Sequence, residues 1–198
     1  MRRTGFLRGF SKLVFHLSGW KLRGSAPDLR KCVMIGAPHT TNWDLPLALL
    51  VLWGHGIDGK WVGKHTVFRW PVGWFMRRLG GIPLDREATR DFVQQSVNEF
   101  AAREELVLLL APEGTRSRVD FWKTGFYYIA LGAGVPIVLG FVDFEHKETG
   151  LGPTLYPTGD IEADFEVMRR FYEDKVGRRP EKTGKVRVRP GRRAPQGA

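Results

Sequence analysis

The feature that most constrains the fold is a regular alternation of short apolar segments with segments of helical periodicity. The apolar segments have the length of β-strands, and they cover residues 32–38, 60–64, 81–85, 105–112 and 135–143. Several contain no polar alternation, as expected when both faces of a sheet are covered. The predicted helices between them are Trp43–Trp53, Phe68–Leu79, Thr89–Arg103, Gly125–Leu131 and a last helix that Asp160 would cap. We therefore predict an α/β fold, a single layered domain with a mostly parallel sheet flanked by helices, plus an N-terminal amphipathic helix.

The composition supports one domain and argues against disulfides and metals. The chain has 198 residues, of which 42% are apolar, which is enough for one sizeable core. Its single cysteine, Cys32, excludes an internal disulfide and a cysteine-based zinc site, and agrees with a reducing compartment. The five histidines show neither an i, i+4 pair nor compact ligand spacing, so we expect no metal site.

Positive charge is concentrated at the two ends of the chain. Residues 1–31 contain eight Lys or Arg and one Asp, and residues 177–198 contain eight Lys or Arg and one Glu. Each end therefore carries +7, which leaves −4 of the net +10 for residues 32–176. Such a distribution indicates an anionic partner for the termini, either nucleic acid or anionic lipid.

The N-terminal segment favours the lipid surface. Apolar residues recur there at helical spacing between basic ones, namely Phe6, Phe10, Leu13, Val14 and Leu17 among Arg2, Arg3, Arg8 and Lys12. A helix over residues 4–20 would be about 25 Å long, which is shorter than a bilayer core of about 30 Å. We expect an amphipathic helix that lies in the membrane interface. An ordinary helix packed on the domain is the alternative.

A polar cluster follows the first predicted strand. Pro38 ends that strand and Thr40 or Thr41 is a natural helix N-cap, so His39 falls in the turn and Asp44 in the first helical turn. Across such a turn, a carboxylate can accept a hydrogen bond from one imidazole nitrogen and leave the other free to take a proton. The pair would be a general base at the carboxyl end of a strand, where α/β sheets bind ligands. The alternative is a capping Asp beside a His that merely satisfies a hydrogen bond.

Further candidate binding residues follow other predicted strands. They are Arg86 at the end of "GGIPLDR", then Glu113, Gly114, Thr115 and Arg116 after the most apolar strand, and Lys123 before the next helix. A glycine lets the backbone approach a ligand closely, and an arginine can grip a phosphate through two parallel hydrogen bonds. Arg118 and Lys147 are better interpreted as solvated loop charges.

In this order, the motifs resemble those of the glycerolipid acyltransferase superfamily, typified by 1-acylglycerol-3-phosphate acyltransferases. His39 and Asp44 match the family's His-x4-Asp motif, and the glycine-rich block closing in Arg86 matches its second motif. Residues 113–116 match its Glu-Gly-Thr-Arg block, with a trailing Lys-x-Gly at Lys123. A Val-Pro-Ile-Val strand at 135–138 completes the set, so the resemblance covers roughly residues 33–143.

The resemblance implies an O-acyltransferase with His39 and Asp44 as catalytic residues and the other matched residues as substrate-binding ones. It implies an acyl thioester donor, either acyl-coenzyme A or acyl carrier protein, and no further cofactor. The acceptor would be a lysophospholipid, foremost 1-acylglycerol-3-phosphate to give phosphatidate; a different lyso-lipid, such as a lyso-aminolipid, is the alternative. Residues 1–24 would be the membrane-associating helix, 25–176 the acyltransferase domain and 177–198 a basic, loosely ordered tail.

We expect the protein to lie peripherally on the cytoplasmic face of the cell membrane, with an anionic membrane surface as a partner and no nucleic acid. A dinucleotide fold and a serine nucleophile lack their motifs. A non-catalytic lipid- or nucleic-acid-binding protein with a silent His–Asp pair is the rival from another class. The segment "FRWPVGWFMRRLGG" at 68–81 is either a core helix with a basic end or a second membrane-facing patch.

Overall fold

The computed structural model describes residues 2–84 and 89–190. Its strands form one seven-stranded sheet in the order β1-β7-β6-β2-β5-β3-β4. Their bounds are β1 Lys21–Arg23, β2 Lys31–Ala37, β3 Gly59–Lys64, β4 Gly81–Leu84, β5 Leu106–Leu110, β6 Ile137–Asp143 and β7 Glu148–Leu155. Neighbouring strands are parallel except for the pair β6 and β7. The predicted fold class, an α/β domain with a mostly parallel sheet, is confirmed.

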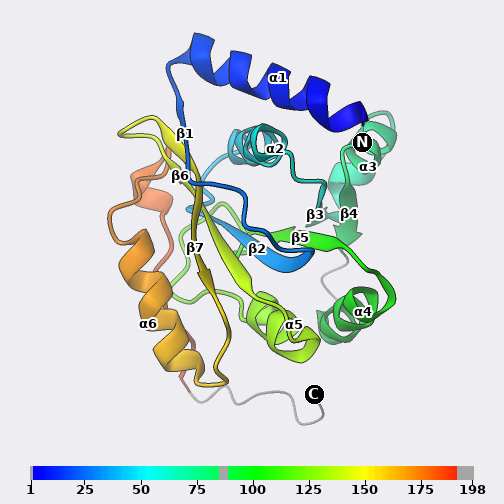
Figure 1. The fold of residues 1–198 in the computed structure, drawn as a ribbon. Helices are drawn as coiled ribbons and strands as arrows, with labels where there is room; N and C mark the ends of the chain where they lie inside the picture. The colour runs from blue at the N-terminus through cyan, green and yellow to red at the C-terminus, as the bar shows by residue number, and fades with distance from the viewer. Residues whose placement is uncertain (1, 85–88, 191–198) are drawn as a thin grey trace.

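Helices cover both faces of this sheet (Figure 1). The first face carries α1 Arg2–Ser18, α2 Asp44–His55 and the short elements η1 His65–Phe68 and α3 Gly73–Arg78. The second face carries α4 Thr89–Ala102, α5 Gly125–Ala133 and α6 Ile161–Tyr172, and the short η2 Pro180–Lys182 follows near the end of the chain. Two layers of helices on a central sheet bury the apolar faces of both kinds of element.

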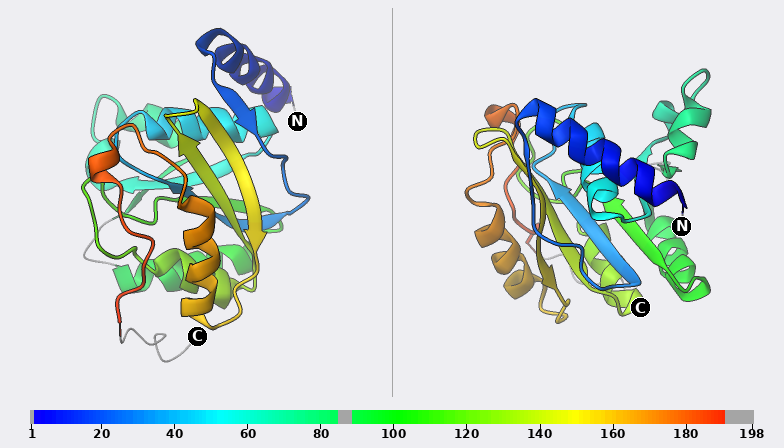
Figure 2. Two further views of the ribbon diagram at one scale, coloured as in Figure 1. Left: turned by 90° about the vertical axis from the view of Figure 1, so that its left-hand side faces the viewer. Right: turned by 45° about the horizontal axis from the view of Figure 1, so that its top comes forward.

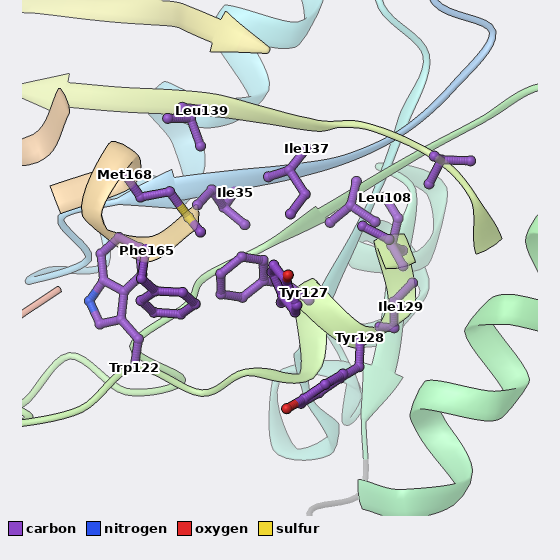
Figure 3. Close-up of a cluster of buried hydrophobic side chains, with 14 of the residues drawn as sticks. Ile35, Leu108, Trp122, Tyr127, Tyr128, Ile129, Ile137, Leu139, Phe165 and Met168 are labelled. Atoms are coloured by element: carbon purple, nitrogen blue, oxygen red, sulfur yellow. The ribbon is translucent and has the colours of Figure 1, made fainter. Parts of the chain in front are cut away.

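The larger hydrophobic core lies between the sheet and the second group of helices (Figure 3). Ile35, Leu108 and Ile137 of three adjacent strands meet Tyr127 and Ile129 of α5 there. The helix α6 adds its own apolar face, and its N-cap is Asp160, whose side chain accepts a hydrogen bond from the backbone of Ala163. The sequence predicted this cap correctly.

Four local details differ from the sequence prediction. The predicted helix over 68–79 is divided into η1 and α3, because Pro71 cannot continue a helix and the preceding backbone is extended at Arg69. Neither Thr40 nor Thr41 is the N-cap of α2, since the helix begins only at Asp44 and its N-cap Trp43 makes no side-chain capping bond. The strands β1 and β7 were not predicted: β1 has three residues, and β7 contains two glycines and a proline.

The helix α1 has one face on the domain and one in solvent. Ser11 and Phe15 are buried against α2, and the Ser11 hydroxyl donates a 2.6 Å hydrogen bond to the Leu50 carbonyl. The opposite face exposes Phe6, Phe10, Leu13 and Leu17. The helix therefore packs on the domain through one face and presents an apolar stripe on the other, and its contact with a membrane stays a prediction. None of the described helices is both long and apolar enough to cross a bilayer.

The described part of the C-terminal segment, residues 177–190, differs from the loosely ordered tail that we expected. After α6 the chain turns back along the body of the molecule (Figure 2). Val188 is buried in the larger core, and the carbonyl of Arg187 accepts a hydrogen bond from the backbone of Trp122. The composition of the segment is basic and rich in glycine, but two alternating valines, Val186 and Val188, supply an apolar edge that packs.

Candidate active site

The sheet brings two of the predicted site segments together because β2 and β5 are adjacent and parallel. Ile35 of β2 lies opposite Leu110 of β5, so the chain leaves both strands at the same level. His39 follows β2 and Glu113 follows β5, and the two residues meet at this carboxyl edge of the sheet. This is the edge at which parallel sheets bind ligands.

His39 and Asp44 form the predicted pair. The imidazole Nδ1 lies 3.1 Å from Asp44 Oδ2. The same oxygen accepts hydrogen bonds from the backbone amides of Thr40 and Thr41 at 2.8 and 2.7 Å, and Oδ1 accepts from the Thr41 hydroxyl at 3.0 Å. Because every partner of the carboxylate is a donor, Nδ1 must carry a hydrogen toward it. That tautomer leaves the lone pair of Nε2 available to accept a proton.

Glu113 secures the other side of the turn. Its side chain is only 2% exposed, and its Oε2 accepts a 2.8 Å hydrogen bond from the backbone N–H of His39. Burial raises the pKa of Glu113 to about 8, the nearby charge of Asp44 raises it further, and hydrogen bonds from the backbones of His39 and Gly184 oppose the shift. A glutamate with this pKa is mostly protonated at neutral pH.

The remaining residues of the β5 exit form a polar loop beside this pair. Gly114 has a positive φ of 65°, and a Cβ there would lie 3.2 Å from the side chain of Lys123, so this turn favours glycine. The Thr115 hydroxyl accepts a hydrogen bond from the backbone of Ser117, while Arg116 and Lys123 have exposed side chains. Arg86 lies outside the described residues, so its place relative to the pair is not part of the structure.

The structure adds contacts that the sequence did not signal. The Thr40 hydroxyl, on the turn that carries His39, accepts a hydrogen bond from the backbone of Arg179 at 3.3 Å. Gly184, farther along the same segment, packs against Glu113 so closely that a Cβ would lie 3.2 Å from it. The C-terminal segment therefore contacts both the turn that carries His39 and the side chain of Glu113. No local pattern in residues 177–190 predicts this, because the contacts depend on backbone groups and on close approach.

A second His–Asp pair lies at the exit of the neighbouring strand β6. His146 Nδ1 is 2.8 Å from Asp143 Oδ2, and the hydrogen bond and charge of Asp143 raise the pKa of this exposed histidine. The Asp143 carboxylate also accepts hydrogen bonds from the backbone amides of Glu145 and His146. The similar geometry makes this pair a useful internal control for the first.

The fold and the pair together define a layered α/β protein with a His–Asp dyad at the exit of a central strand, and comparison with known proteins supplies the family. The chain belongs to the Acyltransferase family, which matches residues 23–138. Distant similarity therefore confirms the resemblance inferred from the motifs.

One curated protein and one solved structure are similar to the chain. The chain is 28% identical over 155 residues to the 1-acyl-sn-glycerol-3-phosphate acyltransferase of Haemophilus influenzae, a match that covers 73% of this chain. It spans only 62% of the length of that relative. Its fold is similar to the crystal structure of the 1-acyl-sn-glycerophosphate (LPA) acyltransferase PlsC from Thermotoga maritima, with a TM-score of 0.60 and 22% identity over 86% of this chain and 78% of that one.

Proposed function

We propose that this acyltransferase moves a fatty acyl group from an acyl thioester to the free hydroxyl of a lysophospholipid. The acceptor would be 1-acylglycerol-3-phosphate and the product phosphatidate, with acyl-coenzyme A or acyl carrier protein as the donor. The observation that carries the proposal is the contact between His39 and Asp44 at a strand exit. Membership of the family and the activity of the Haemophilus influenzae relative support it.

In this mechanism, Nε2 of His39 takes the proton of the acceptor hydroxyl while its oxygen attacks the thioester carbonyl carbon. Asp44 stabilises the imidazolium that forms, because its carboxylate is held in place by the amides of Thr40 and Thr41. Collapse of the tetrahedral intermediate breaks the C–S bond, and the leaving thiolate takes the proton back from His39. Glu113 fixes the backbone of His39 and thereby positions the base.

The exposed cations of the β5 exit, Arg116 and Lys123, would bind the phosphate of the acceptor together with Arg86. The guanidinium can form two parallel hydrogen bonds with a phosphate, which an ammonium cannot reproduce. Gly114 and Thr115 would shape this loop.

The acylated product and the acceptor are both membrane lipids, so we also propose that the protein works as a peripheral protein at the cytoplasmic face of the membrane.

The base is tested with His39→Ala, for which we expect a loss of about 10²–10⁴-fold in turnover. The turn should survive the change, because Asp44 and Glu113 hold it through backbone amides rather than through the imidazole. His146→Ala is the matched control, since it removes the other Asp-paired histidine. Turnover of a labelled acyl thioester by the purified variants is the measurement, and wild-type turnover in His39→Ala would refute the mechanism.

The acceptor is tested with Arg116→Ala on a panel of lysolipids with and without a phosphomonoester. A charge-assisted hydrogen bond is worth about 1.5–3 kcal/mol, so the KM for a phosphomonoester acceptor should rise roughly tenfold or more while the donor KM changes little. Arg116→Lys should also be impaired, and Arg118→Ala, in the same loop, should not. A change confined to the donor KM would mean that this loop binds the donor instead.

A further inference from the structure

The connection between β3 and β4 presents a second exposed apolar surface, separate from α1. Its large side chains point into solvent, with Trp70 92% exposed and Trp74 67% exposed. This Trp70 surface consists of Val67, Trp70, Val72, Trp74 and Phe75. Large contiguous apolar patches on a soluble protein usually mark a contact site.

The segment that carries the Trp70 surface packs on the domain through its inner side chains. Phe68 is buried and stacks on Trp61, with ring centroids 5.5 Å apart, and the Trp61 indole N–H donates a 3.1 Å hydrogen bond to the Leu79 carbonyl. Gly73 lies so close to the Phe68 backbone that any Cβ would overlap the Phe68 carbonyl oxygen. The segment therefore has a packed inner face and a separate outer face. Its exposed tryptophans are part of a built platform rather than of an unpacked loop.

The segment that carries the Trp70 surface is basic, although Asp58 precedes it and Asp85 and Glu87 follow it in the sequence. Residues 59–84 carry five basic residues and no Asp or Glu, although residues 32–176 as a whole are net negative. The basic residues are Lys60, Lys64, Arg69, Arg77 and Arg78. Arg77 lies 5.4 Å from the centre of the Phe68 ring, which packs beneath the Trp70 surface. Tryptophan combined with arginine is the composition that favours the membrane–water interface.

We infer that the Trp70 surface is a membrane-docking site that inserts Trp70 and Trp74 into the interface of an anionic bilayer. It lies on the same face of the sheet as α1, because Phe68, Met76 and Leu79 share a core cluster with Phe15 (Figure 1). One membrane plane on that side of the molecule would meet both elements. This contact deepens the proposed function, because it identifies how an enzyme acting on membrane lipids would be oriented on the bilayer.

The test uses the full chain with Trp70→Ser and Trp74→Ser combined. Both side chains are mostly exposed, so the fold should tolerate the change. The matched control is Tyr156→Ser with Val167→Ser, which removes two exposed apolar side chains outside the platform, the second on α6 across the sheet. The charges are tested by combining Arg69→Ser with Arg78→Ser. The control combines Arg103→Ser, just after α4, with Arg170→Ser on α6.

Binding is measured by flotation with vesicles of zwitterionic phospholipid, with and without about 30% anionic phospholipid. The tryptophan variant should bind at least about tenfold more weakly at low and at high salt, because the loss is of buried apolar area. The arginine variant should weaken only at low salt and only on anionic vesicles. Both controls should bind as the wild type does. Equal binding by the tryptophan variant and the wild type would overturn the inference.

A second measurement separates this surface from α1. Residues 2–18 contain no tryptophan, and the nearest one, Trp20, packs against Phe144, so quenching of tryptophan fluorescence by vesicles with brominated acyl chains should report mainly on the Trp70 surface. Most of the quenching should disappear in the tryptophan variant, and unchanged quenching would contradict the inference. A wild-type dimer that this variant dissociates, with unchanged quenching, would assign the surface to a second copy of the chain instead. Turnover of a soluble short-chain acceptor tests the proposed function separately, because it needs no bilayer.

Discussion

At the scale of single residues, the site depends on two carboxyl groups with different tasks. The Asp44 carboxylate accepts hydrogen bonds from the amides of Thr40 and Thr41 and lies against His39 Nδ1. Glu113 is sealed inside the protein and accepts from backbone amides. The sequence placed both residues at the site, but it assigned Glu113 to substrate binding. The buried position of its side chain supports a positioning role, because the side chain contacts the backbone that carries the base.

The raised pKa of Glu113 predicts a pH dependence of stability. In the unfolded chain the group titrates near its ordinary pKa of 4.5, and in the folded protein near 8. Folding therefore favours the protonated form, so this contribution is fully present below pH 4.5 and is lost as the pH rises through about 8. Glu113→Gln cannot ionise. Between pH 5 and pH 8 the variant should become more stable relative to the wild type, with the difference in free energy of unfolding growing by up to about 1.4 kcal/mol per pH unit.

Urea unfolding of both proteins across this pH range measures the difference, and groups that the two proteins share cancel. Glu162→Gln, which changes an exposed glutamate on the first turn of α6, is the control and should follow the wild type. A constant difference between Glu113→Gln and the wild type from pH 5 to pH 8 would show that Glu113 is ionised throughout.

At the scale of elements, the sequence predicted what depends on local pattern. Apolar runs such as 105–112 gave the central strands, because a strand buried on both faces needs no polar alternation. Asp160 identified the start of α6. The strand β7 was missed because its residues, with two glycines and a proline, have low strand propensity and are held by pairing with β1 and β6. Contacts between distant segments, such as Arg179 to Thr40, leave no local signal at all.

The two faces of α1 predict two separable effects. Phe15 is 4% exposed and packs on α2, so Phe15→Ala should lower the free energy of unfolding by about 3 kcal/mol or more. Phe6 is 78% exposed, so Phe6→Asp with Phe10→Asp should leave stability within about 1 kcal/mol but weaken vesicle binding at every salt concentration. Urea unfolding and flotation measure the two effects. A large loss of stability in the double Asp variant would mean that the exposed face is covered within the protein.

At the scale of the whole molecule, the sheet separates α1 from the described part of the basic C-terminal segment, residues 177–190. The N-terminal helix lies on one face with η1 and α3, whereas Val186 and Val188 pack in the core of the other face. If α1 and the Trp70 surface dock, we expect the basic residues beside Val186 and Val188 to meet the membrane only through long-range attraction. Such attraction is screened within about 8 Å at physiological salt. The equal charges of +7 at the two ends do not imply equal contacts.

Two truncations distinguish these parts of the tail. Deletion of residues 178–198 removes Gly184 and Val188, so it should lower the melting temperature by several degrees and reduce turnover even on a soluble short-chain acceptor. Deletion of residues 191–198 removes two arginines and keeps every contact described for residues 176–190. It should melt as the wild type does and weaken binding to anionic vesicles only at low salt, where the Debye length is long. Arg192→Ser with Arg193→Ser should reproduce that weakening. An unchanged melting temperature after deletion of residues 178–198 would show that this segment, which contacts Thr40 and Glu113, does not support the site.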